Sequence, residues 1–126
     1  MTEADVVCGK IIRACIEVHK ALGPGLMEKV YQQCLCRELT LQGLQYKSEV
    51  PVSLNYKGVQ LDVTLRADLL VEDMVLVEIK AVNEWNALFE AQLISYLKLA
   101  EKPAGLLVNF NVPLMKDGIK RLFNGA

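Results

Sequence analysis

The sequence predicts an α/β fold in which a mixed central sheet is flanked by helices, and three observations lead to this fold class. The chain has 126 residues, 52% of them hydrophobic and 23% charged, which fits one compact domain over residues 1–126. Two segments with helical hydrophobic spacing come first, and several apolar runs of strand length follow them. Another helical segment then separates the last buried run from the earlier ones.

Two helices are expected at the start of the chain. Over residues 4–22 the apolar side chains recur at intervals of three and four, which is the spacing of one helix face. Gly23-Pro24-Gly25 ends this helix, because proline lacks a backbone donor and glycine tolerates the turn. The same spacing resumes over residues 26–41, and Gly43 is the expected cap of the second helix.

The middle of the chain has the pattern of strands. Residues 50–56 and 59–65 are predicted to form a hairpin around Lys57-Gly58. Residues 67–71 and 74–79 are nearly continuous apolar runs, so both are expected to be central strands covered on two faces.

The remaining elements follow in order. Helical spacing returns over residues 86–100, and Pro103 closes that helix. Residues 104–110 predict another buried strand, and residues 116–123 predict a short amphipathic helix at the end.

The net charge and its distribution along the chain limit how the protein could bind nucleic acid. The net charge of −1 provides no global positive field that would attract phosphate. Local charge is uneven, since residues 62–90 are mainly acidic and the chain from Lys98 onward is mainly basic. An acidic middle beside a basic flank suits a divalent-metal site next to a phosphate-binding surface, with Lys98 among the phosphate-binding side chains. A solvated surface without function is the alternative.

The sequence favours a reduced, cytoplasmic protein. No stretch approaches ~20 uninterrupted apolar residues, so no membrane association is expected. The four cysteines have no Cys-x-x-Cys spacing and are expected to be unbridged thiols, with a zinc or iron–sulfur site as the alternative. They are Cys8, Cys15, Cys34 and Cys36.

Charged side chains concentrate on the two predicted central strands. Glu78 and Lys80 are two apart on a strand and therefore point the same way. A tight turn at Glu72-Asp73 would place Asp68 opposite residue 77 or 78, and thus close to Glu78. Two interpretations remain open: Lys80 neutralises the acids in a buried salt bridge, or the two carboxylates bind a divalent cation such as Mg²⁺.

These residues resemble a known signature. Asp68 followed by Glu78-Ile79-Lys80 is similar to the motif of the PD-(D/E)XK nucleases, although Ala67 rather than proline precedes the first acid. Gly25, Glu28 and Tyr31 have the spacing of the GxxExxY proteins of that superfamily. Further agreement covers residues 18–25, 66–71, 90–93, 96–98 and 118–121.

The resemblance implies a restriction-endonuclease-like αβββαβ core, as well as a metal site. In that scheme Asp68, Glu78 and the Ile79 carbonyl hold Mg²⁺ or Mn²⁺, and Lys80 acts on the attacking water. Glu28 approaches from its helix.

The helix over residues 86–100 adds a further match. Gln92 and Tyr96 correspond to the Q-x-x-x-Y pattern of the RecB-like branch, where these residues support the site or contact nucleic acid. Tyr31 is expected either to hydrogen-bond Glu28 near the substrate or to pack in the core, and packing is favoured.

The predicted function is therefore a metal-dependent nuclease, with DNA favoured over RNA as substrate. The alternative is a catalytically silent module that keeps the fold and binds nucleic acid or protein. A homodimer is expected, because one domain of this size is small for surrounding a duplex.

Overall fold

A computed structural model describes residues 1–61 and 65–125 of the chain, and it begins with the two predicted helices. Helix α1 spans Glu3–Leu22 and α2 spans Glu28–Leu41. Thr2 and Asp5 form a capping box at the start of α1, in which each side chain accepts the other's backbone N–H. Gly23 ends α1 with a φ of 67°.

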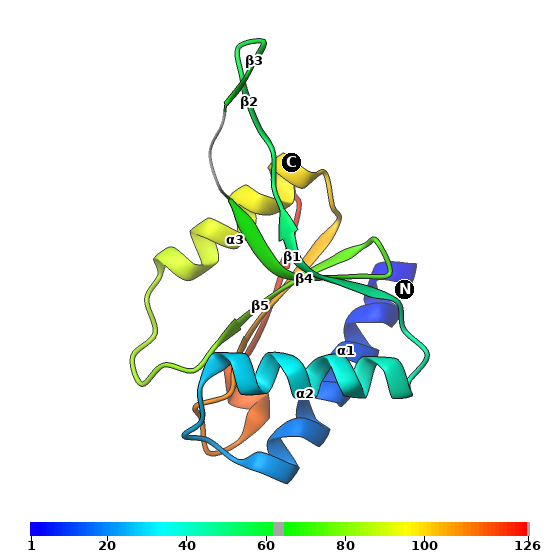
Figure 1. The fold of residues 1–126 in the computed structure, drawn as a ribbon, viewed down its shortest axis with the longest axis vertical. Helices are drawn as coiled ribbons and strands as arrows, with labels where there is room; N and C mark the ends of the chain where they lie inside the picture. The colour runs from blue at the N-terminus through cyan, green and yellow to red at the C-terminus, as the bar shows by residue number, and fades with distance from the viewer. Residues whose placement is uncertain (62–64, 126) are drawn as a thin grey trace.

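The centre of the molecule is a five-stranded mixed sheet with the order β1-β4-β5-β6-β7 (Figure 1). Strands β5 and β6 are parallel and joined by α3, while the other neighbouring pairs are antiparallel. The predicted mixed sheet flanked by helices is confirmed. The bounds are β1 Tyr46–Pro51, β4 Arg66–Val71, β5 Val75–Lys80, α3 Leu88–Ala100, β6 Ala104–Asn109 and β7 Ile119–Phe123.

Helices cover both faces of this sheet, and the alternation along β5 decides where its charged residues lie. Val77 and Ile79 pack into the core formed with α1 and α2. Leu76 packs into the second core, beneath α3. Glu78 and Lys80 share the parity of Leu76 and therefore belong to the α3 face. No helix among the described residues is long and apolar enough to span a membrane.

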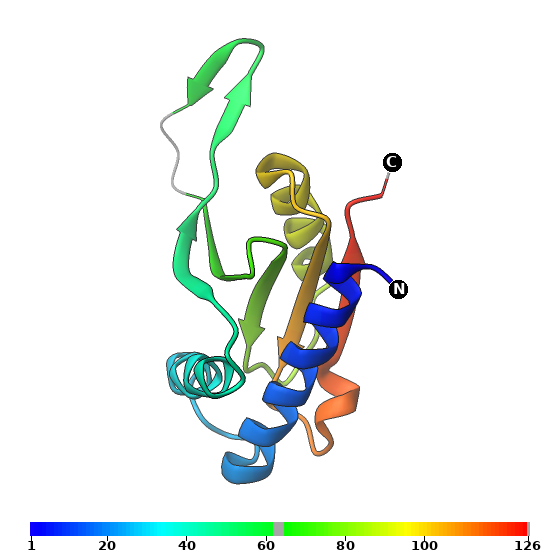
Figure 2. The same cartoon turned by 90° about the vertical axis from the view of Figure 1, so that its right-hand side faces the viewer.

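The predicted hairpin is present around its turn, as a separate two-stranded sheet that projects from the body of the molecule (Figure 2). Its predicted first run is divided, because residues 50 and 51 belong to β1. It consists of β2, Leu54–Tyr56, and β3, Val59–Leu61. Lys57 and Gly58 both have positive φ, at 49° and 84°, as a two-residue hairpin turn requires. The predicted second run continues through residues 62–64, which lie outside the described residues.

The helix predicted over residues 116–123 is wrong. A short 3₁₀ turn, η1 (Met115–Gly118), leads into β7, which pairs antiparallel with β6. Gly118 permits this turn, because a β-carbon there would collide with the Asn109 carbonyl oxygen. In β7 only Leu122 is buried, beneath α3, so the segment is a half-buried edge strand whose charges face solvent.

Candidate active site

Two carboxylates meet where β4 and β5 begin to separate. Leu69 pairs with Val77, and the same register places Asp68 opposite Glu78. The Asp68 amide donates to Glu78 Oε1 at 3.0 Å, and the Ile79 amide donates to Asp68 Oδ2 at 2.7 Å. The prediction that Asp68 and Glu78 are neighbours on adjacent strands is confirmed.

The pair is poorly solvated. Glu78 is 6% exposed and Asp68 is half-buried. Burial, and then the Asp68 charge, raises the pKa of Glu78 to about 7. Burial also raises the pKa of Asp68, against the opposing effect of the Ile79 amide. Without a cation, the two negative charges therefore destabilise each other.

Lys80 lies near the pair but is not bonded to it. In the described parts of the chain, no ion pair within 4.0 Å joins Lys80 to Asp68 or Glu78. Its Nζ lies over the Phe89 ring, 4.5 Å from the centroid. The Lys80 charge still opposes the rise in the pKa of both carboxyls, which burial causes. The structure therefore lacks the direct ion pair on which the salt-bridge interpretation depends.

The free oxygens of the pair suit a hard divalent cation. Asp68 Oδ1 and Glu78 Oε2 make no hydrogen bond with any described residue. Neither atom is completely buried, so both remain accessible. Carboxylate oxygens are the ligands that Mg²⁺ and Mn²⁺ prefer. The Ile79 side chain is buried on the other face, so this residue can offer only its carbonyl. These donors fit the expected ion.

The set of side-chain ligands is small. Over residues 1–61 and 65–125, no three His, Cys, Asp or Glu residues form a group that could hold a metal ion. Main-chain carbonyl and water oxygens would have to complete the coordination, as is common for Mg²⁺.

A family model described as the PD-(D/E)XK nuclease superfamily matches residues 5–122. The chain belongs to this superfamily. It is also similar to the crystal structure of SSO0001, with a TM-score of 0.52 and 23% identity over 75% of this chain. The match spans 47% of the SSO0001 chain and supports the fold alone. Among curated proteins, no sequence matches.

Glu28, expected from the superfamily resemblance, approaches the pair from α2. It is the first residue of that helix and is exposed. Together with Ala81, which follows Lys80, it lines an open cavity of about 470 Å³. After burial and the Asp68 charge, the Glu28 charge also contributes to the raised pKa of Glu78. Glu28 therefore lies within electrostatic range of the pair.

Tyr31 has an internal role. Its side chain is fully buried and stacks on Phe110 with 4.5 Å between ring centroids. Its hydroxyl donates to the Gly23 carbonyl at 2.6 Å and accepts the Leu26 amide at 3.1 Å. Tyr31 thus holds the loop that leads to Glu28. It lies too deep to contact a substrate, so the structure supports the packing alternative.

Helix α3 brings Gln92 and Tyr96 together but not Lys98. Gln92 Nε2 donates to the Tyr96 hydroxyl at 3.3 Å. Gln92 also lines an open cavity of about 510 Å³ beside Lys80, while Tyr96 is 7% exposed. Lys98 is exposed, and two residues along a helix turn it to a different face from Tyr96. The helix therefore presents Gln92, rather than Lys98, beside the motif lysine.

Asn109 is a buried polar residue that the sequence did not single out. At the end of β6, it accepts the Val82 amide and donates to the Val82 carbonyl, both at 3.1 Å. The next residue, Phe110, donates its amide to the Lys80 carbonyl at 3.0 Å. The parallel strand therefore fixes the chain just beyond the motif lysine. An asparagine that ends an apolar strand gives no sequence signal for such a role.

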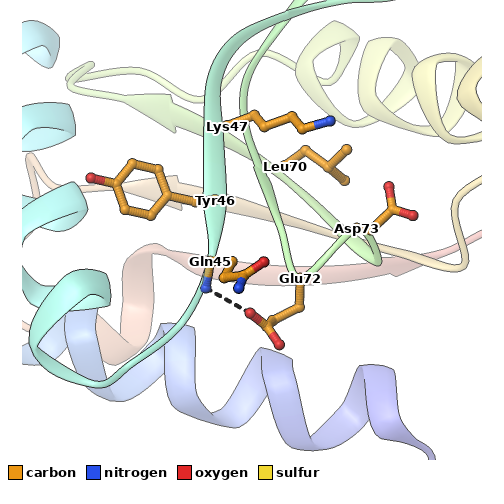
Figure 3. Close-up of a pocket in the computed structure, with 6 residues that line it drawn as sticks. All are labelled: Gln45, Tyr46, Lys47, Leu70, Glu72 and Asp73. Carbon is orange, nitrogen blue, oxygen red and sulfur yellow. Dashed lines mark hydrogen bonds between the residues drawn. The ribbon is translucent and has the colours of Figure 1, made fainter.

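A cavity of about 360 Å³ is lined by residues 45–47 at the start of β1 and by residues at the turn between β4 and β5 (Figure 3). There the Gln45 amide donates to Glu72 Oε2 at 2.6 Å. This turn lies at the opposite end of the two strands from Asp68 and Glu78. None of the expected site residues lines the cavity, so it has no part in the candidate active site.

Proposed function

We propose that the chain is a nuclease of the GxxExxY group, in the RecB-like branch, which hydrolyses phosphodiester bonds of DNA with Mg²⁺ or Mn²⁺. The observation that carries this proposal is the opposed pair Asp68 and Glu78. Each carboxylate accepts a backbone amide through one oxygen, and its other oxygen has no hydrogen bond within residues 1–61 and 65–125. Membership of a nuclease superfamily over residues 5–122 supports the reaction class.

The proposed roles follow from where the side chains lie. Asp68, Glu78 and the Ile79 carbonyl hold the ion. A bound divalent ion supplies a Lewis acid and lowers the pKa of a bound water. Lys80 forms no ion pair with any residue that the structure describes, and it places positive charge where the phosphate becomes more negative in the transition state.

Two further polar side chains complete the proposed site. Gln92 lies beside Lys80 in the same cavity and orients the phosphate or the attacking water. Its bond to the Tyr96 hydroxyl holds it in place. Glu28 reaches the site from the start of α2 and accepts a proton from the water. Lys98, on another face of α3, contributes a phosphate contact away from the reacting group.

The test is a panel of single- and double-stranded DNA and RNA substrates incubated with Mg²⁺, Mn²⁺ or chelator. We expect cleavage of DNA that requires metal and is lost in Lys80→Ala. Lys20→Ala is the matched control, because Lys20 is an exposed lysine in the last turn of α1. Metal-independent cleavage, or cleavage that persists in Lys80→Ala, argues for a contaminating nuclease. Binding of nucleic acid without cleavage supports the silent module.

We also propose that the active unit is a homodimer. Tyr56, Val59 and Leu61 expose apolar surface on the projecting hairpin, at 60%, 58% and 40%. Closed two-fold dimers are the commonest assembly of soluble chains. Sedimentation equilibrium should give twice the mass of one chain. A monomer at micromolar concentration contradicts the proposal.

A further inference from the structure

The edge strand β1 is irregular directly across from Asp68. Ser48 pairs with Leu69 and Val50 pairs with Ala67, but the intervening Glu49 is absent from the ladder although the register places it opposite Asp68. Glu49 has a φ of 53°, in the left-handed region that favours glycine. The register is the same on both sides of Glu49, so no residue is inserted and the irregularity lies in the backbone of this one residue. A left-handed residue inside a strand breaks the alternation of side chains between the two sheet faces.

This left-handed backbone turns the Glu49 side chain toward α2. In a regular strand Ser48 and Glu49 would point to opposite faces, yet both line one cavity of about 330 Å³ beside that helix. There Gln32 Nε2 donates to Glu49 Oε1 at 3.2 Å. Lys29 and Arg66 each form an ion pair with the Glu49 carboxylate at 3.6 Å.

Gln32 continues the connection to the candidate ligand. It is a buried polar residue, 9% exposed, and its Nε2 also donates to the Asp68 carbonyl oxygen at 3.4 Å. One amide group thus bridges the Glu49 side chain and the main chain of Asp68. The Asp68 backbone is therefore held from α2 on one side, while its carboxylate is held by the Ile79 amide on the other.

Ordinary surface pairing does not account for Glu49. The ion pairs are long, and the Glu49 side chain is 36% exposed, where such pairs contribute little. The other described non-glycine residues with positive φ lie in turns or at a helix end. They are Lys57, Glu72, Asp73 and Glu101. An unfavourable backbone inside a strand is typical of functional sites.

We propose that Glu49 is a positioning residue for the metal site: through Gln32 it fixes the main chain of Asp68 and so aims the Asp68 carboxylate. The inference rests on the proposed function, in which Asp68 binds a divalent ion. Glu49 does not touch the ion. Residues that orient metal ligands in this way commonly change metal affinity about 10- to 100-fold when they are replaced.

The test compares Mn²⁺ binding by calorimetry in wild type and Glu49→Gly. Glycine adopts the left-handed backbone without strain, so the variant loses the Glu49–Gln32 hydrogen bond while the fold is retained. We expect an unchanged melting temperature and an affinity about 10- to 100-fold weaker. Glu101→Gly is the matched control, because it relieves a φ of 55° at the exposed end of α3 and should bind Mn²⁺ as wild type does.

Glu49→Gln separates positioning from charge. Glutamine still offers an oxygen to Gln32 but carries no charge, so positioning predicts an affinity close to wild type. An affinity as weak as that of Glu49→Gly would instead assign the effect to charge and overturn the inference. If circular dichroism shows that Glu49→Gly is unfolded, Gln32→Leu is titrated in its place, with the same weakening expected and wild-type affinity overturning the inference.

The outcomes also separate this inference from the proposed function. A wild-type chain that binds no Mn²⁺ overturns both. Wild-type binding that is unchanged in Glu49→Gly overturns only the positioning role and leaves the proposed metal site standing.

Discussion

Asp68 and Glu78 each bind the main chain of the opposite strand. Glu78 Oε1 accepts the Asp68 amide at 3.0 Å, and Asp68 Oδ2 accepts the Ile79 amide at 2.7 Å. Beyond the last regular pair, Leu69 with Val77, the strand amides thus donate to carboxylate oxygens rather than to main-chain carbonyls. One oxygen of each is held in the sheet, and the other remains available to a ligand.

Asp68→Asn should preserve the fold and abolish metal binding. Asparagine keeps an oxygen for the Ile79 amide but removes one of two like charges, so the metal-free variant should be as stable as wild type or more stable. Wild type should gain about 2.7 kcal/mol at a metal concentration 100 times Kd, and the variant should gain none. The measurement is thermal unfolding with chelator and with Mg²⁺ or Mn²⁺.

Asp117→Asn is the control for this substitution, because Asp117 is exposed and lies in the 3₁₀ turn η1, outside the strands that carry the pair. It should retain the full metal effect. A wild-type midpoint that ignores both metals, together with a strongly destabilised Asp68→Asn, would instead indicate a structural role for the pair.

The stability of the metal-free chain should fall as pH rises from about 4.5 to about 7. Burial raises the pKa of Glu78 from 4.5 to about 7, so across this window the folded chain binds more protons than the unfolded chain. The slope from this group is at most about 1.4 kcal/mol per pH unit. Urea unfolding at a series of pH values measures it, and Glu78→Gln should flatten it.

Saturating Mn²⁺ should reverse this dependence, because the ion binds the deprotonated carboxylates. Stabilisation by Mn²⁺ should therefore increase toward pH 7. A metal effect of equal size at pH 5 and pH 7 would argue that the ion binds elsewhere.

Lys80→Met should separate catalysis from stability. Methionine retains much of the contact with Phe89 and loses the charge, so the stability should change by no more than about 1 kcal/mol. Stabilisation by metal should persist, while the cleavage rate should fall about 10²- to 10³-fold. Lys57→Met removes another lysine over an aromatic ring, that of Tyr56, and serves as the control for stability. A loss of several kcal/mol in Lys80→Met alone would restore the salt-bridge interpretation.

Tyr31→Phe should destabilise the chain by about 1–3 kcal/mol, because the Gly23 carbonyl and the Leu26 amide lose their partner. Urea unfolding measures the change. The control is Tyr46→Phe, whose hydroxyl makes one long exposed bond, at 3.4 Å from Thr40 Oγ1. Weaker binding of nucleic acid with unchanged stability would point back to a substrate contact.

Thiol titration should find four free sulfhydryls in the denatured chain, since all four cysteines are free in the structure. In the native chain Cys34 and Cys36, which are partly exposed, should react first. Cys8 and Cys15 are buried, and burial raises the pKa of the Cys15 thiol to about 12, so both should react only on unfolding. Fewer than four thiols in freshly reduced, denatured protein would contradict the absence of disulfides.

The sequence pattern around one turn was enough to predict that Asp68 and Glu78 are neighbours. A tight turn at Glu72-Asp73 limits the register to two choices, with Asp68 opposite residue 77 or 78, so counting along the chain already placed Asp68 near Glu78. The structure adopts the second register, in which Val71 pairs with Val75. Helix α1 was equally predictable, because its spacing is regular and its ends carry Thr2 and Gly23. The C-terminal strand was not predictable, since the alternation of apolar and polar residues in β7 is short. Pairing with the edge of β6 decided its conformation.

The sequence by itself thus determined the order of most elements, the shared face of Glu78 and Lys80, and the superfamily motif, because these depend on local period and spacing. Only the tertiary structure decided that Tyr31 is fully buried and that Glu49, with a positive φ, lies opposite Asp68. The physical reason is that these features depend on contacts between segments far apart in the sequence. The burial of a side chain is set by the element that packs against it, and the sequence pattern of a single segment does not encode that packing.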